Sequence, residues 1–163
     1  MNHKAQVDQD YRELDLADSL RKDGRAAEAL QVALANVARV QALVPETIRE
    51  YRRFDLRSIP PIEAGANLAA ILGDASAFRE IRAVVESKPE LAPWQVVVNK
   101  AEQDLASVRT IRQLVLQEPG LIQASLGKRI GIEGRRGSDL SYRLAQAGLL
   151  RREKRGAGYQ LFS

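Results

Sequence analysis

The first part of the chain places apolar residues at helical spacing between glycine and proline breaks. One stripe, at steps of three residues, precedes Asp23 and Gly24 and consists of Tyr11, Leu14, Ala17 and Leu20. A second stripe of small and branched residues runs from Ala26 to Val40 and is followed by Pro45. Because glycine accepts left-handed geometry and proline cannot continue a helix, the pattern predicts two helices joined as an antiparallel hairpin.

A second hairpin is predicted downstream, over residues 62–72 and 75–87, with its turn at Gly73. This turn follows the Gly24 turn by 49 residues, and both turns join a small-residue helix to one with larger apolar residues. The pair resembles tetratricopeptide-like helical hairpins, although a repeat of that family is about 34 residues long and its signature residues are mostly missing. Between the hairpins, Glu46–Phe54 is expected to form a short, arginine-rich helix.

A long helical pattern covers residues 94–118 and ends at Pro119. We expect its tryptophan to be a core anchor and its two halves to pack on different parts of the protein. The boundary is placed near Asp104, which gives a helical-hairpin interaction or dimerisation domain over 1–104 and a second domain over 105–163.

The last forty residues change from helical to strand periodicity. Gln123 to Ile130 predicts a short helix that closes at Gly131, and a second helical pattern follows with Leu140 and Leu144 on its apolar face. After these helices, apolar residues flank a basic, glycine-bearing turn over 154–158, which is typical of a β-hairpin. The fold class is therefore mainly α, with a small β-hairpin at the end of the chain.

Positive charge is concentrated in this C-terminal part. Residues 121–163 hold nine of the chain's 25 basic residues but three of its 21 acidic residues, although the net charge of the whole chain is only +4. Such an asymmetry is typical of a domain that approaches phosphates while the remainder stays unattached. A solvated basic surface is the alternative interpretation.

The composition limits the kinds of catalytic and metal-binding sites that the chain can form. The chain has no cysteine, and its one histidine, His3, lies in a terminus that we expect to be frayed. No nucleophile with a base, no glycine-rich phosphate loop and no metal-ligand set can be assembled, so we expect neither an enzyme nor a bound cofactor or metal. The polar first residues and the absence of long apolar runs predict a cytoplasmic protein without a membrane partner.

The run from Leu121 to Arg152 resembles the winged helix-turn-helix of MarR-like bacterial transcription regulators. In that family a helix reading roughly Gln-Ala-x-Leu-x-x-x-Leu-Gly precedes a recognition helix that ends in Arg-Leu-x-x-x-Gly-Leu. The matching residues here are Gln123, Ala124, Leu126, Ile130 and Gly131, followed by Arg143, Leu144, Gly148 and Leu149. The resemblance covers the last third of the chain and implies duplex DNA binding, although winged helices also serve as protein-interaction modules.

Two features depart from that family. Gly134 and Gly137 stand where stronger helix formers are usual, so we expect the second helix to begin near Ser138 and its first turn to order on DNA. The family's regulators usually dimerise through helices on both sides of the winged helix, whereas this sequence stops at the wing. A second copy or another protein would then bind the N-terminal helices, and a dimer would present its recognition helices about 34 Å apart.

The candidate DNA-binding residues are polar or basic groups of the two short helices, the turn between them and the hairpin: Lys128, Arg129, Arg135, Arg136, Ser138, Tyr142, Arg143, Lys154 and Arg155. Arginine pairs with guanine edges, serine and tyrosine bind phosphate, and a basic wing contacts the backbone or minor groove. Lys128 and Arg129 suit phosphate better than bases. Asp139 is interpreted as a helix cap, while Arg143 has an acidic partner in its own domain as its alternative role.

These residues predict sequence-specific duplex binding, and the resemblance to MarR-like proteins implies a bacterial transcription regulator. Two alternatives remain open: a helical-repeat adaptor whose winged helix contacts proteins, and an RNA-binding protein. The salt dependence of binding separates the adaptor from a nucleic-acid binder, because each neutralised DNA phosphate contributes a logarithmic slope of about −0.9.

Overall fold

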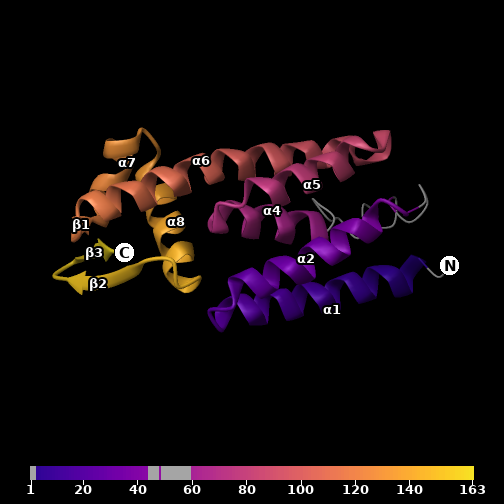
Figure 1. Cartoon of the computed structure of the whole chain (residues 1–163), viewed down its shortest axis with the longest axis horizontal. Helices are drawn as coiled ribbons and strands as arrows, with labels where there is room; N and C mark the ends of the chain where they lie inside the picture. Colours follow the sequence, from indigo (N-terminus) through magenta and orange to yellow (C-terminus); the bar gives the residue numbers. More distant parts are fainter. Residues whose placement is uncertain (1–2, 44–47, 49–59) are drawn as a thin grey trace.

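A computed structural model describes residues 3–43, 48 and 60–163, and within them the protein is mainly helical with one small antiparallel sheet (Figure 1). The C-terminal elements gather at one end of the molecule and the N-terminus lies at the other. The expected fold class is confirmed in this form. The short helix predicted over Glu46–Phe54, and the proline break before it, lie outside the described residues apart from Ile48.

Two helical hairpins form the N-terminal part. Helices α1 (His3–Lys22) and α2 (Ala26–Val40) meet at Gly24, and helices α4 (Pro60–Leu72) and α5 (Ala75–Glu86) meet at Gly73. Both glycines adopt left-handed backbone geometry, with φ of 76° and 70°, as their positions after the apolar stripes predicted. Helix α1 begins at His3, the first described residue, and fraying of this terminus stays a prediction.

Small residues let these helices pack closely. Alanines from α1, α2, α4 and α5 are almost fully buried in one hydrophobic cluster, and Gly65 of α4 has the side chains of Ile81 and Val37 at its surface. A Cβ at Gly65 would lie 3.2 Å from Cδ1 of Ile81, which leaves no room for a larger residue without a shift. Trp94 is buried in the same cluster, which confirms its role as a core anchor.

Helix α6 (Gln95–Gln117), which follows a 3₁₀ segment over Pro89–Trp94, runs along the molecule (Figure 1). Its first half supplies Val98, Ala101 and Leu105 to the N-terminal cluster. Its second half supplies Val108, Ile111 and Val115 to a second cluster, together with residues of the C-terminal elements. Ala26 and Ile71 also belong to this second cluster, so the two hydrophobic clusters adjoin. The division into domains near Asp104 stays a prediction.

The C-terminal part follows α6 in the order β1 (Leu121–Ile122), a 3₁₀ turn (Gln123–Ser125), α7 (Leu126–Ile130), α8 (Gly134–Gln146), β2 (Arg151–Arg155) and β3 (Gly158–Phe162). The strand order is β1-β3-β2, and both pairings are antiparallel. The hairpin was predicted, but β1 was not. Leu121 pairs with Leu161 and both are buried, so β1 ties the start of this part to its end.

Candidate nucleic-acid interface

Helices α7 and α8 cross at a point where only glycine fits. A Cβ at Gly127 would lie 2.7 Å from the carbonyl oxygen of Ile132 and 2.9 Å from the backbone of Gly134. Gly131 ends α7 in left-handed geometry, and the amide of Ile132 donates to the carbonyl of Gly127 across 2.9 Å. This contact brings the first turn of α8 against the backbone of α7.

The first turn of α8 is helical, so the prediction of a start near Ser138 is wrong. The helix begins at Gly134, and Asp139 therefore lies within it and is not its N-cap. The cause is tertiary packing, because a Cβ at Gly137 would lie 3.3 Å from Cβ of Leu126 in α7. The low helix propensity of two glycines is outweighed by this close helix contact.

Helix α8 has three sides. Leu140 and Leu144 lie in the second hydrophobic cluster, as predicted. The opposite side carries the exposed residues Arg135, Asp139 and Tyr142. The third side, at positions 136 and 143, faces α6 and the N-terminal helices. The candidate residues on α8 are therefore divided between an outer side and an inner one.

Arg136 lies on the inner side and is held by a distant acidic residue. Its Nε donates to Oδ1 of Asp104 in α6 across 2.9 Å, and its Nη2 donates to the same oxygen. The Asp104 side chain is only 9% exposed. The sequence near Arg136 had offered no such partner, since Asp104 is 32 residues away. This pair fixes the first turn of α8 to α6.

The other candidates on α8 differ in exposure. Arg135 is exposed and forms no ion pair with a described residue. Tyr142 is exposed, and its hydroxyl accepts from Nε2 of Gln146 across 2.9 Å. Ser138 is half-buried. Arg143 lies 3.9 Å from Oδ2 of Asp139, so its alternative role as an ion-pair partner receives only a loose contact, and its side chain is 25% exposed.

The two cations of α7 are not equivalent. Arg129 binds the Glu118 carboxylate with both terminal nitrogens, at 3.0 and 2.9 Å. This hydrogen bonding lowers the pKa of Glu118 and raises the pKa of Arg129. Lys128 is exposed and has no ion pair with a described residue. Lys128 is thus the more available of the two for a phosphate.

The hairpin tip also separates its two cations. Lys154 is exposed without an ion pair to a described residue, whereas Arg155 lies 3.3 Å from Oε2 of Glu153 and donates to Gln160 across 3.1 Å. The tip turns at Gly156, where φ is 58°. Lys154 therefore projects beside a turn that glycine makes possible.

Arg152 was not among the candidates, yet it joins three elements. Its guanidinium carbon lies 4.0 Å from the ring centre of Tyr159 and 5.4 Å from that of Tyr142. Its Nε donates to Oε1 of Gln123 across 2.8 Å. Cation–π contact and hydrogen bonding together orient the β2–β3 hairpin against α8. Its sequence neighbours gave no signal, because both tyrosines and the glutamine lie elsewhere in the chain.

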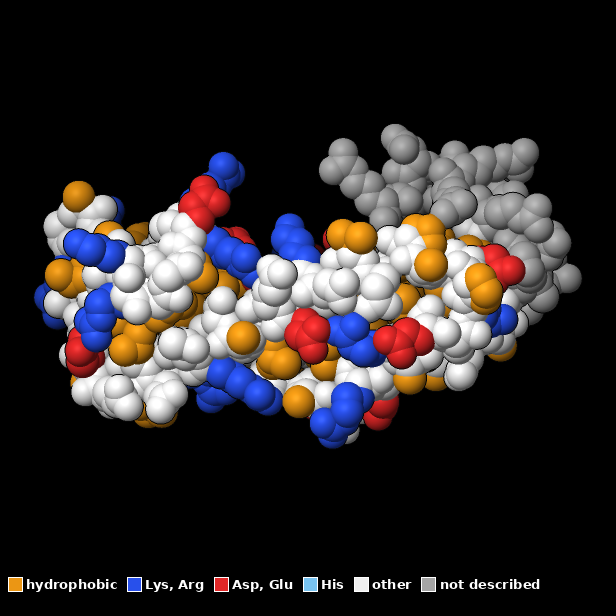
Figure 2. All heavy atoms as spheres, turned by 90° about the horizontal axis from the view of Figure 1, so that it is seen from above, with side chains coloured by type: hydrophobic (Ala, Val, Ile, Leu, Met, Phe, Trp, Pro, Cys, Tyr) orange, Lys and Arg blue, Asp and Glu red, His pale blue; other side chains and the backbone are white. Residues whose placement is uncertain are grey.

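Three cations of the C-terminal part are thus exposed and without an ion pair to a described residue: Lys128, Arg135 and Lys154. Figure 2 shows basic side chains distributed over this end of the molecule, with fewer acidic ones on that face. These cations come from α7, α8 and the hairpin.

Among the described residues, no three His, Cys, Asp or Glu side chains come together as a metal-binding group, and no helix has the length and apolar character needed to cross a membrane. Comparisons of the chain with protein-family models, with curated proteins and with solved structures found no significant match. The geometry of the C-terminal part is therefore the basis for the functional proposal.

Proposed function

We propose that the C-terminal part is a winged helix-turn-helix that binds duplex DNA in transcription regulation, and that the protein is not an enzyme. The observation that carries the proposal is the arrangement of α6, β1, α7, α8, β2 and β3, with β1 paired to β3 and one side of α8 exposed. In helix-turn-helix proteins the second helix of the motif enters the major groove. Helix α8 would be that recognition helix.

The exposed side of α8 supports base recognition by the first turns of this helix. Arg135 would make paired hydrogen bonds to a guanine edge, and Tyr142 would bind a phosphate or pack on a sugar. The N-terminal end of a helix also favours nearby phosphate, because its backbone amides point outwards. Lys128 on α7 and Lys154 on the hairpin are exposed and would contact the phosphate backbones beside the groove.

Arg136 has a different role in this proposal. Because it is bound to Asp104, it would set the angle between α8 and α6 and would not read a base. Arg129 and Arg155 are engaged by Glu118 and Glu153, so their contribution to phosphate binding would be smaller than that of Lys128 and Lys154. The tetratricopeptide-like hairpins at the other end of the molecule would bind a second copy or a partner protein.

The test compares two neighbouring arginines. Arg135→Ala and Arg136→Ala are purified with the unchanged protein, and each is offered a random pool of labelled duplexes. We expect the unchanged protein to enrich one sequence. Arg135→Ala should lose discrimination by about 1–3 kcal/mol at one base position and keep the same unfolding free energy. Arg136→Ala should instead lower the unfolding free energy.

A salt series identifies the phosphate contacts. Lys154→Ala and Lys128→Ala should each reduce the logarithmic salt slope by about 0.9 without changing the enriched sequence. Arg112→Ala, an exposed arginine on α6, serves as the matched control. Absence of duplex binding at low salt, or equal binding by Arg135→Ala and the unchanged protein, would reject the proposed recognition helix. Stronger binding to single-stranded or double-stranded RNA would favour an RNA-binding protein.

A further inference from the structure

Arg152 of β2 is oriented by an uncharged partner. Its Nε donates to Oε1 of Gln123 across 2.8 Å, and Gln123 is a buried polar residue in the turn before α7. Arg136 is held instead by the Asp104 carboxylate, which offsets its positive charge. A neutral amide fixes the direction of a guanidinium group without this offset. Arg152 therefore has a defined orientation and keeps its positive charge available to a ligand.

The terminal nitrogens of Arg152 remain as donors. Within the described part of the chain, its Nη1 and Nη2 have no hydrogen bond or ion pair. The neighbouring Glu153 is engaged by Arg151 and Arg155, each at 3.3 Å. Because successive residues of a strand point to opposite faces, these three side chains lie on the face of β2 away from Arg152. The two nitrogens of Arg152 form the planar fork of donors that matches two oxygens of a phosphate.

Two tyrosine rings limit the movement of this guanidinium group. Its carbon lies 4.0 Å from the ring centre of Tyr159 in β3 and 5.4 Å from that of Tyr142 in α8, both within cation–π range. Arg152 is half-buried, so an anion can still reach it. A side chain that is held in place before binding loses less conformational entropy when a ligand binds. Arg152 is therefore better prepared for an anion than an exposed arginine such as Arg112.

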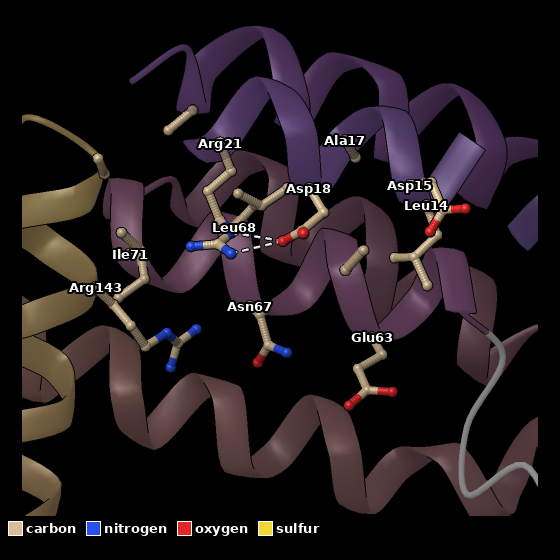
Figure 3. A pocket seen from close by; sticks show the side chains of 13 residues that line it. Leu14, Asp15, Ala17, Asp18, Arg21, Glu63, Asn67, Leu68, Ile71 and Arg143 are labelled. Carbon is tan, nitrogen blue, oxygen red and sulfur yellow. Dashed lines mark hydrogen bonds and ion pairs between the residues drawn. The ribbon is translucent and has the colours of Figure 1, made fainter. Parts of the chain in front are cut away.

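Tyr142 is itself positioned by a chain of hydrogen bonds from α1. Nη1 of Arg21 donates to Oε1 of Gln146 across 2.6 Å, and Nε2 of Gln146 donates to the Tyr142 hydroxyl across 2.9 Å. Figure 3 shows Arg21 beside Asp18, to which its Nη2 is bound at 2.6 Å, on the wall of a cleft between the N-terminal helices and α8. Because the Tyr142 hydroxyl accepts from Gln146, its own proton remains for a phosphate oxygen.

We propose that Arg152 and Tyr142 bind one phosphate group where β2 meets α8. The two terminal nitrogens of Arg152 would donate to two phosphate oxygens, and the Tyr142 hydroxyl would also donate to the phosphate. Gln123 and Tyr159 are positioning residues, because they act through Arg152. The assignment of this phosphate to a DNA backbone rests on the proposed function, whereas phosphate binding itself does not.

Lys154 extends this phosphate site along the hairpin. It lies on the same face of β2 as Arg152, two residues or about 7 Å further along the strand. Its ammonium group would therefore bind a neighbouring phosphate and not the same one. Two cations spaced along one strand suit a chain of phosphates, as in a nucleic-acid backbone, better than a single inorganic ion.

Titration of the DNA-free protein with inorganic phosphate tests the site. Nitrogen–proton NMR spectra follow the assigned Nε–H signals of Arg152 and Arg112 while phosphate replaces chloride at constant ionic strength. We expect the Arg152 signal to shift in a saturable manner and to give an affinity roughly tenfold higher than that of Arg112, which is exposed on α6. Equal affinities at the two arginines would reject the phosphate site.

Gln123→Glu tests the role of the neutral partner. The new carboxylate keeps the hydrogen bond to Nε and nearly the same shape, but it offsets the charge of Arg152. Phosphate affinity should fall roughly tenfold, and the logarithmic salt slope of duplex binding should fall by about 0.9, as for one lost phosphate contact. Gln113→Glu adds the same charge at an exposed position of α6 and should change neither quantity. Equal behaviour of the two variants would overturn the proposal.

The two measurements separate this inference from the proposed function. Saturable phosphate binding at Arg152 without duplex binding would reject the proposed function and support the phosphate site. Duplex binding without preferential phosphate binding at Arg152 would reject the phosphate site alone. The phosphate titration of the unchanged protein needs no substitution, so it stays decisive even if Gln123→Glu impairs folding.

Discussion

The N-terminal helices and the C-terminal part differ in charge balance and not in ion pairing. Both parts contain ion pairs, such as Arg82 with Glu102 and Arg129 with Glu118, and both contain exposed cations without an ion pair to a described residue, such as Arg79 and Lys128. Residues 121–163 hold nine basic and three acidic residues, whereas residues 1–120 hold 16 basic and 18 acidic ones. Exposed ion pairs contribute little to stability, so the difference bears mainly on the net charge that each part presents to a ligand.

The two parts also differ in how their helices approach one another. Alanines separate the N-terminal helices, whereas α7 and α8 meet through glycine backbone. A methyl group can be accommodated by small movements of side chains, but backbone atoms cannot move without shifting a whole helix. The position of α8 is therefore more sensitive to substitution than the packing of the N-terminal hairpins.

The largest effect is expected for Gly127→Ala. Its new methyl group would lie 2.7 Å from the carbonyl oxygen of Ile132, so we expect the unfolding free energy to fall by about 3 kcal/mol. Gly134→Ala is the control, because a Cβ there meets nothing within 4 Å and alanine favours the helix. Denaturant unfolding measures both. Equal stabilities of the two variants would contradict the close helix contact.

The next effect concerns Arg136 and Asp104. Removing Arg136 leaves a buried carboxylate without this partner, and we expect Arg136→Ala to lower the unfolding free energy by about 2 kcal/mol. Asp104→Ala should also destabilise, and the double variant should be more stable than the sum of the two losses implies. Denaturant unfolding of all four proteins gives the coupling free energy. Additive losses would show that the pair does not act together.

The predictable parts of the fold depend on local sequence. Gly24 and Gly73 end helices because their backbone geometry is needed directly after an apolar stripe, and both signals are visible within a few residues. Strand β1 has only two residues and no periodicity of its own. It forms because Leu121 pairs with Leu161. These residues are far apart in the sequence, so the pairing depends on the tertiary fold and leaves no local signal.

The candidate site was predictable as a region but not residue by residue. Composition and spacing identified the basic C-terminal part. Sequence alone could not separate Arg135 from Arg136, because Asp104, which binds only the second of these, lies 32 residues away. The start of α8 was missed for the same reason, since contacts between α7 and Gly137 outweigh the low helix propensity of glycine.

The smallest effect is a pH dependence in the N-terminal part. Hydrogen bonds from Lys22, and then from Arg21, lower the pKa of Asp18. A lowered pKa in the folded state stabilises the protein above the unfolded value, which is about 3.9, and this contribution is lost as pH falls through the folded value. Asp18→Asn should therefore melt slightly below the unchanged protein at pH 7, and the gap should narrow below pH of about 4. Melting curves across this range measure it, and a constant gap would contradict the assignment.

Helix α6 has a consequence for cooperativity. It contains 23 residues, and its apolar side chains enter both hydrophobic clusters. Unfolding of this helix would expose the apolar side chains of both clusters. The free energies of unfolding of the two ends of the molecule are therefore linked through one helix. The amide hydrogens in the middle of α6 should therefore exchange with solvent only when the whole molecule unfolds. A substitution that destabilises one end should also lower the stability of the other end.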